Sequence, residues 1–275
     1  MSTAPERGVT TEEELAGLLE RAVEDAVEAA DTRTSYRTPL VGFASAGDSR
    51  FADLKTHIGP HHLLPEDVLE GAKSVISFFL PFSAEVVDAH RVRRGSVARE
   101  WAVAYSETNE LIGDVCERLS RVLREHGHEA TFAPATGNFE RATFESTWSH
   151  KSCAVIAGLG RFGLHHMVIT EAGCAGRFGS VVTTAPLKPA PRMARELCIH
   201  LAGGTCKDCV SRCPVGALNG RGELDKELCW QRCTAVSKRF TDLGPKNKIC
   251  GKCAVGRCAL EVPKKGDRSR ARKVP

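Results

Sequence analysis

The feature that most constrains this chain is the crowding of cysteines near its C-terminal end. Of the 12 cysteines in the 275-residue sequence, nine lie between Cys198 and Cys258. The stretch CKDCVSRCP, which begins at Cys206, repeats the last three positions of the run C-x2-C-x2-C-x3-C-P that binds iron–sulfur clusters. The first position of that run would fall on Gly203, so one ligand has to come from elsewhere in the chain.

A second group of cysteines, in the stretch CGKCAVGRC, has the spacing C-x2-C-x4-C, and two further cysteines lie between the groups. Two four-iron clusters require eight thiolates, and the cysteine before proline serves the neighbouring cluster. The glycine-containing loop IHLAGGT is expected to let Cys198 fold back into the empty position. The predicted ligands of the first cluster are Cys198, Cys206, Cys209 and Cys258. Those of the second are Cys213, Cys250, Cys253 and one of Cys229 or Cys233, with Cys229 preferred.

Zinc and disulfide bonds are the alternative explanations for these cysteines. The C-x2-C pairs at 206–209 and 250–253 suit a tetrahedral zinc site, but such a site leaves five nearby cysteines unused. The N-terminal sequence MSTAPERGVTTEEELAG has no basic start followed by an apolar block, so the cytoplasm is the expected location. Because thiols stay reduced there, metal binding is favoured over disulfides.

Composition limits the class of protein further. Hydrophobic residues make up 42% of the chain and charged residues 26%, and no apolar run reaches the roughly 18 residues of a membrane span. The net charge of +4 is too small to indicate nucleic-acid binding, and the basic stretch KKGDRSRARK is expected to be solvated. The change in cysteine content predicts a large domain over 1–190, a small domain over 191–262 and a basic tail over 263–275.

The N-terminal region has the patterns of helices and buried strands, which predict an α/β fold. The stretch TTEEE has capping-box spacing and is followed by apolar residues at helical intervals, so it predicts an opening helix. The apolar run SVISFFLPF over 74–82 predicts a strand buried on both faces. A second long helix is predicted over about 98–126, with Cys116 on its apolar face, and the stretches HMVIT and GSVVTT predict short strands.

Glycines and histidines between these strands suggest a binding function, each with an alternative. In GLGRFG, the glycines Gly158, Gly160 and Gly163 would let the backbone approach a cofactor closely, although a structural turn explains them equally well. His165 and His166 are metal-ligand types, but a doublet beside an apolar strand is expected to be partly exposed.

Taken together, the chain resembles epoxyqueuosine reductase and, more distantly, the corrinoid-dependent reductive dehalogenases. The resemblance runs from about residue 40 to residue 258, through PEDVLEGAKSVISFFLPF, AGLGRFG, GRFGSVVTT, CKDCVSRCPVGALNGRGELDKELC and KNKICGKC. It implies a nitroreductase-like α/β sandwich domain that holds cobalamin, followed by a ferredoxin-like domain with two 4Fe–4S clusters. It also implies that Cys229, which follows LD in LDKELC, is a ligand.

The sequence departs from this family at the position of its expected proton donor. The family carries an aspartate before a Pro-x-x-Glu-Arg segment, but an ungapped count places Phe144 there, with Glu145 beside it and His150-Lys151 in place of Glu-Arg. This departure therefore favours a relative with a different substrate over a tRNA-modifying enzyme.

These observations predict a cobalamin-dependent reductase, an oxidoreductase that passes electrons from its clusters to a corrinoid. Its expected partners are a small-molecule or modified-nucleoside substrate and an external low-potential electron donor; tRNA is allowed but not favoured, and no membrane is expected. The alternatives are a two-cluster electron-transfer protein without its own substrate and a flavin-bound reductase.

The predicted catalytic residues are Glu145, His150 and Tyr105. The predicted cofactor-binding residues are Gly158, Gly160, Arg161, Gly163 and Lys151.

Overall fold

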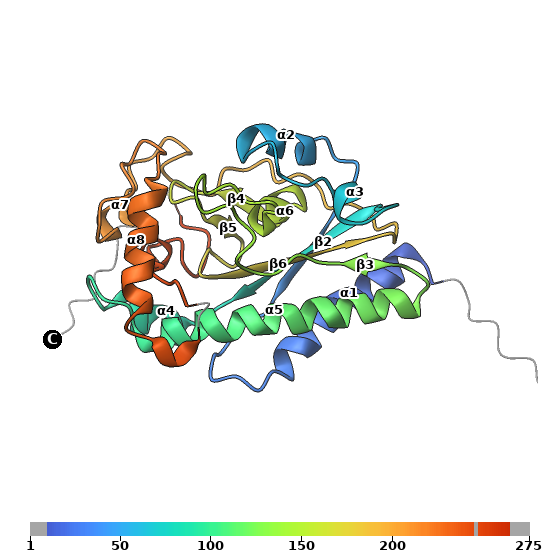
Figure 1. Ribbon diagram of the computed structural model, residues 1–275, viewed down its shortest axis with the longest axis horizontal. Coiled ribbons are helices and arrows are strands. Elements are labelled where there is room, and N and C mark those ends of the chain that lie inside the picture. The colour runs from blue at the N-terminus through green and yellow to red at the C-terminus, as the bar shows by residue number, and fades with distance from the viewer. Residues whose placement is uncertain (1–9, 245–246, 265–275) are drawn as a thin grey trace, which may run out of the picture.

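The computed structural model describes residues 10–244 and 247–264, which form a mixed α/β fold built on an antiparallel sheet (Figure 1). The sheet has the strand order β1-β2-β6-β3, and a separate pair of strands, β4 and β5, lies beside it. The strands are β1 (Leu40–Ser45), β2 (Ser74–Pro81), β3 (Ala130–Thr131), β4 (Gly160–Phe162), β5 (Val168–Thr170) and β6 (Gly176–Thr183). The basic tail predicted over 263–275 lies almost entirely outside the described residues.

The two central strands, β2 and β6, are almost entirely buried, and most of their side chains are apolar. Every residue of β2 is buried, which confirms the strand predicted over 74–82. Phe78 of β2 pairs with Gly179 of β6, where an added Cβ would lie 2.2 Å from the Phe78 ring. This glycine thus makes room for an aromatic ring inside the sheet.

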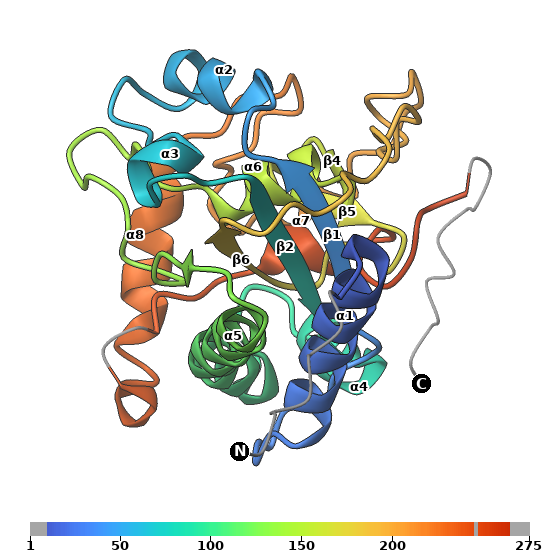
Figure 2. The same ribbon diagram turned by 90° about the vertical axis from the view of Figure 1, so that its right-hand side faces the viewer.

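Two long helices, α1 (Glu12–Glu28) and α5 (Arg99–Glu125), cover one face of the sheet (Figure 2). The capping box that begins α1 is confirmed, since the Glu14 amide donates to Thr11 Oγ1 at 3.2 Å and the Thr11 amide donates to the Glu14 carboxylate at 2.9 Å. The predicted second helix is confirmed as α5, and Cys116 on it is fully buried in the core.

The opposite face is covered by α6 (His150–Ile156) and by α2 (Arg50–His57), with the short α3 (Pro65–Val68) nearby (Figure 2). Ser149 caps α6 by accepting from the Ser152 amide at 3.2 Å. Trp148 lies just before that cap and donates from its indole nitrogen to Ser180 Oγ at 3.0 Å, which ties the start of α6 to β6.

The cysteine-rich region lies at one end of the sheet, close to α4 (Ala84–Arg91) and the start of α5 (Figure 1). Its elements are α7 (Asp208–Arg212), α8 (Lys226–Ser237), η1 (Thr241–Leu243) and η2 (Lys252–Val255). One hydrophobic cluster joins the two regions, with Phe82 and Trp101 on one side and Ile249 and Val255 on the other. Among the described helices, none has both the length and the apolar content needed to cross a bilayer.

Candidate redox site

A cavity of about 480 Å³ lies where the cysteine-rich region meets the N-terminal region. From the cysteine-rich side it is lined by Cys213, Cys229, Cys233, Cys250 and Cys253. From the N-terminal side it is lined by polar groups that include Tyr105, His150, Lys151 and Arg177. The cysteines predicted for the second cluster therefore line the same cavity as three other predicted site residues, Tyr105, His150 and Lys151.

A second and much smaller cavity gathers the other predicted ligands. Its lining includes Cys198, Cys206, Cys209 and Cys258. Its volume is about 20 Å³, little more than one water molecule occupies. His165 lines both cavities and therefore lies between them.

The loop that carries Cys250 and Cys253 is positioned by the N-terminal region. The buried ring of His90 donates from Nε2 to the Cys250 carbonyl at 2.9 Å and accepts from the Ala98 amide at Nδ1. Gly251 has a φ of +69° and packs on Trp101, where an added Cβ would lie 2.4 Å from the indole nitrogen. Only a glycine allows this approach and this backbone angle together.

Cys229 and Cys233 lie one turn apart on α8 and interact with each other. The hydrogen bond between them lowers the pKa of the Cys229 thiol to about 7 and raises the pKa of the Cys233 thiol. Cys229 is therefore the better thiolate of the pair, which is the form that binds metal. Cys213 accepts a hydrogen bond from the Ala217 amide at its sulfur, at 3.3 Å.

Tyr105 and Arg177 form a pair on the wall of the larger cavity. The Arg177 guanidinium lies 4.2 Å from the centre of the Tyr105 ring and donates to Asn109 Oδ1 at 2.7 Å. Burial raises the pKa of the Tyr105 hydroxyl, but the charge and hydrogen bond of Arg177, with one from Thr136, offset that effect and leave the pKa lowered. The pair offers a polarised hydroxyl to a ligand in the cavity.

His150 and Lys151 also line the cavity, but both already have protein partners. His150 bonds Ser180 Oγ at 2.8 Å and the Pro134 carbonyl at 3.1 Å, so both ring nitrogens are used, and burial lowers the pKa of the ring. Lys151 donates to the His166 carbonyl at 2.9 Å, and burial lowers the pKa of its amine.

Glu145 and Arg161 are not brought to either cavity. The Glu145 carboxyl lies against Gly59, where an added Cβ would approach it to 2.5 Å. It follows Phe144, whose φ of +57° turns the chain at this point. Arg161 donates to the Met193 carbonyl at 3.2 Å and faces Glu196. The structure thus gives Glu145 no place beside the other predicted catalytic residues.

The glycines of GLGRFG face the chain itself instead of a cavity. An added Cβ would lie 2.7 Å from the Pro191 carbonyl oxygen at Gly158, 2.2 Å from the Ile169 carbonyl oxygen at Gly160, and 2.8 Å from Ile169 Cδ1 at Gly163. These contacts favour the structural turn over the close approach of a cofactor.

Two residues of the site carry no motif in the sequence. His165 is buried, with Nε2 3.4 Å from Cys174 Sγ and 3.5 Å from Cys258 Sγ, and Cys174 is fully buried. The expectation of a partly exposed doublet is right for His166, which is exposed, and wrong for His165. The burial of His165 depends on how β4 and β5 pack, which no spacing in the sequence reveals.

The fold and these cavities define a mixed α/β protein with a cysteine-rich unit at one end of its sheet. No family model matches the sequence. Curated relatives are the epoxyqueuosine reductase of Listeria monocytogenes, 25% identical over 241 residues that cover 86% of this chain and 54% of the relative, and that of Bacillus subtilis, 25% identical over 73% of this chain and 49% of the relative. The chain thus spans about half the length of the curated relatives it matches.

Solved structures show the same fold at lower identity. An epoxyqueuosine reductase in complex with an epoxyqueuosine-modified tRNA stem loop superposes with a TM-score of 0.59 and 20% identity, covering 89% of this chain and 66% of that one. A reductive dehalogenase described as B12-dependent superposes with a TM-score of 0.57 and 14% identity, over 95% of this chain and 34% of that one. The resemblance to both families that the sequence predicted is confirmed.

Proposed function

We propose that this chain is an iron–sulfur reductase related to epoxyqueuosine reductase, in which two 4Fe–4S clusters deliver electrons to a corrinoid. The observation that carries the proposal is the division of nine cysteines between two adjacent cavities, the larger of which is also lined by polar groups of the N-terminal region. A zinc site would use only four of these cysteines. Two clusters would use eight.

The chemistry of the donors suits the two clusters. In the smaller cavity four thiols, those of Cys198, Cys206, Cys209 and Cys258, match the four ligands of one cluster. In the larger cavity Cys213, Cys229, Cys250 and Cys253 supply the other four, and Cys233 remains as a hydrogen-bond donor to Cys229. The set in the larger cavity is the inner one, because it shares that cavity with Tyr105 and Arg177.

A corrinoid would enter the larger cavity only in part, because it is larger than a ligand of drug size. About 480 Å³ encloses a ligand of drug size, and a cluster would take part of that space. When bound, a corrinoid supplies the strongly reducing cobalt chemistry that protein side chains lack. Lys151 and Arg177 are the cationic groups that the N-terminal region contributes to the wall, and they can hold the polar substituents of the corrinoid. Arg232, Lys248 and Lys252 line the cavity from the cysteine-rich side.

The residues of the cavity wall have distinct roles in this proposal. Tyr105 holds the proton for the substrate at its hydroxyl, and Arg177 orients it and stabilises the phenolate that remains. His150 keeps the wall in place through its bonds to Ser180 and Pro134, since neither ring nitrogen is free to exchange a proton.

The substrate is a small molecule or a modified nucleoside, and an external low-potential donor supplies the electrons. One structural relative was solved with a modified tRNA stem loop, which supports the nucleoside class. In this chain Phe144 occupies the position of the family's expected acid and packs under the Arg141 guanidinium, 4.5 Å from its ring centre. This difference favours a substrate other than the one the relatives reduce.

The proposal is tested by the anaerobic absorption spectrum of the purified chain, with iron and cobalt analysis after incubation with cobalamin. We expect about eight irons per chain and retained cobalamin with a shifted spectrum. Stoichiometric zinc in place of iron contradicts the proposal as a whole.

A two-cluster electron-transfer protein without its own substrate is the second candidate. It is favoured by the limited volume of the larger cavity and by Phe144 at the position of the expected acid. The same experiment separates the two, because iron-loaded protein that retains no cobalamin supports the electron carrier.

A further inference from the structure

We propose that His165 and Cys174 are positioning residues of the redox site: they donate hydrogen bonds to the Cys258 sulfur and thereby raise the reduction potential of the cluster that Cys258 holds. The inference rests on the proposed function, because it requires a cluster on Cys258. It assigns a role to two buried residues that the sequence patterns leave unassigned.

The three side chains meet in one compact group. His165 Nε2 lies 3.5 Å from Cys258 Sγ and 3.4 Å from Cys174 Sγ, and the two sulfurs are 3.8 Å apart. His165 and Cys174 are buried and Cys258 is half-buried. A hydrogen bond to sulfur at these distances is shielded from water, which strengthens it.

The tautomer of His165 sets the direction of its hydrogen bond. The Met167 amide donates to His165 Nδ1 at 3.2 Å, so Nδ1 is the acceptor of the neutral ring. The ring hydrogen is therefore on Nε2, the atom that faces the two sulfurs. The ring packs against Gly163, where an added Cβ would lie 2.9 Å from His165 Cε1.

Backbone contacts hold Cys174 beside Cys258. The Cys174 amide donates to the Cys258 carbonyl at 2.9 Å, and the Ala175 amide donates to the Ala259 carbonyl at 3.0 Å. Gly173, with a φ of +80°, lies so close that an added Cβ would be 2.3 Å from the Ala259 carbonyl oxygen. The contact between the sulfurs of Cys174 and Cys258 thus follows from the close backbone packing of the loop before β6 against the end of the cysteine motif.

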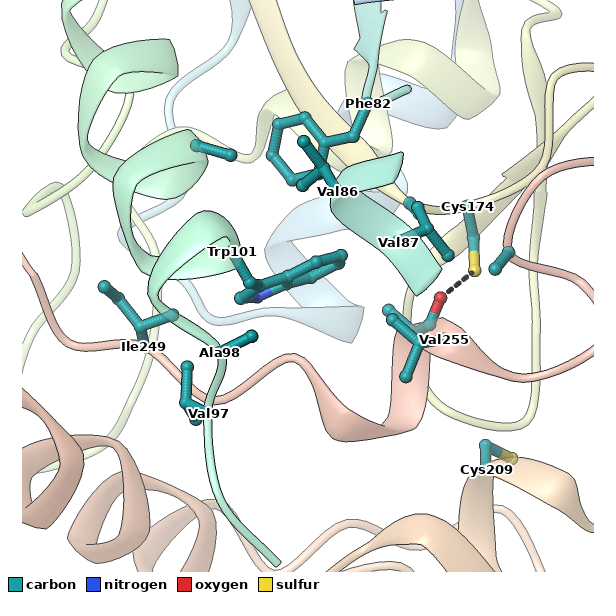
Figure 3. Close-up of a cluster of buried hydrophobic side chains, with 14 of the residues drawn as sticks. Phe82, Val86, Val87, Val97, Ala98, Trp101, Cys174, Cys209, Ile249 and Val255 are labelled. Carbon is teal, nitrogen blue, oxygen red and sulfur yellow. Dashed lines mark hydrogen bonds between the residues drawn. The ribbon is translucent and has the colours of Figure 1, made fainter. Parts of the chain in front are cut away.

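The thiol of Cys174 has two acceptors within reach. Figure 3 shows its sulfur directed at a backbone carbonyl oxygen beside Val255, which is that of Ala254, at 3.5 Å. The other acceptor is Cys258 Sγ. When Cys258 is a cluster ligand its sulfur carries negative charge, so the charge-assisted bond to sulfur is the stronger of the two.

The effect of these donors on the cluster follows from charge. One-electron reduction adds one negative charge to the cluster and moves no proton, and hydrogen bonds to the ligand sulfurs stabilise the more negative form. The two donors are therefore expected to raise the reduction potential of the Cys258 cluster. They are not expected to change the reduction potential of the cluster in the larger cavity. His165 is well placed for this role because it lies between the two cavities.

The test is an anaerobic redox titration, followed by electron paramagnetic resonance, of the iron-loaded full chain. His165→Leu and Cys174→Ala each remove a donor, and we expect one reduction step to move to lower potential while the other step and the iron content stay unchanged. His165→Gln and Cys174→Ser retain a donor and are expected to give smaller shifts. The control is Cys153→Ala, at a buried thiol of α6 that lines neither cavity; it is not expected to move a step.

Three results overturn the inference. Unchanged reduction steps in both His165→Leu and Cys174→Ala show that the donors have no effect. Loss of half of the iron in Cys174→Ala makes Cys174 a ligand instead of a donor. One zinc per wild-type chain that is lost in Cys174→Ala assigns the group to a tetrahedral zinc site, which its separations also suit. Wild-type protein without iron refutes the proposed function itself, whereas the first two results leave that function standing.

Discussion

At the scale of single residues, Cys198 is the predicted ligand that does not fit the motif spacing, because it lies eight residues before Cys206. Its thiol nevertheless lines the same cavity as those of Cys206, Cys209 and Cys258, across the loop of residues 199–205. The loop turns at Gly203, which has a φ of +86°. We propose that this return of the chain lets Cys198 replace the cysteine missing at position 203.

We predict that Cys198→Ala lowers the iron content from about eight to about four per chain, because a cluster with three thiolates is not retained. Cys233→Ala is expected to keep about eight, since Cys229 is the thiolate of that pair. Iron and acid-labile sulfide analysis after anaerobic reconstitution measures both. The assignment is wrong if Cys198→Ala retains full iron or if Cys233→Ala loses half of it.

Residue patterns predicted some parts of the site and missed others for a physical reason. The cysteines of each predicted set line one cavity, and their assignment as cluster ligands stays a prediction. His165 was considered but expected to be partly exposed, and Cys174 was not singled out, because their meeting with Cys258 depends on the packing of two loops distant in sequence. Glu145 follows the left-handed backbone of Phe144 and its carboxyl lies against Gly59, a position that the sequence pattern does not indicate.

At the scale of elements, the segment that enters α6 depends on a buried histidine. His62 stacks on Trp148, with ring centres 5.9 Å apart, and its Nε2 accepts from the amide of Ser149, the cap of α6. Its Nδ1 donates to the Leu63 carbonyl at 2.9 Å. Burial lowers the pKa of His62, so the ring is neutral in the folded chain.

We predict that the stability of the folded chain falls as the pH decreases through about 6.5, the ordinary pKa of histidine. Below that pH the unfolded chain binds a proton at His62 that the folded chain does not, which costs at most about 1.4 kcal/mol per pH unit. Urea unfolding of wild type and His62→Gln at pH 7.5 and 5.5 measures the difference. The other buried histidines titrate in both proteins and cancel, so equal pH dependence in the two proteins contradicts the prediction.

The strength of the sequence pattern decided which elements were predictable. The helices α1 and α5 and the strand β2 have long, regular patterns, and all three were predicted close to their bounds. The strands β3 and β4 have two and three residues. Segments of that length carry too little periodicity to identify, and their pairing is set by the tertiary fold.

At the scale of the whole molecule, the N-terminal and cysteine-rich regions share one core. Trp101 stacks on His90, with ring centres 4.6 Å apart, and both contact the loop that holds Cys250 and Cys253. Lys252 of that loop is buried and donates to the His90 carbonyl at 2.6 Å. The two regions were predicted as separate domains from composition, which cannot reveal a shared interface.

We predict that Gly251→Ala destabilises this interface by about 2 kcal/mol or more, because the added Cβ clashes with Trp101 and the backbone angle is strained. Gly216→Ala is the matched control: Gly216 has a φ of +68° but no atom within 4 Å of an added Cβ, so only the cost of about 1 kcal/mol for the angle remains. Thermal unfolding of the two variants measures the difference. Equal losses in both show that the Trp101 contact is dispensable.

The shared core also limits how the N-terminal and cysteine-rich regions can be separated or exchanged in engineered proteins. Because Ile249 and Val255 are buried against Phe82 and Trp101, the cysteine-rich segment expressed alone would expose this apolar surface to water. A chimera that joins it to a different N-terminal region would have to recreate both that surface and the hydrogen bond from His90. The N-terminal and cysteine-rich regions are therefore expected to have evolved together as one unit.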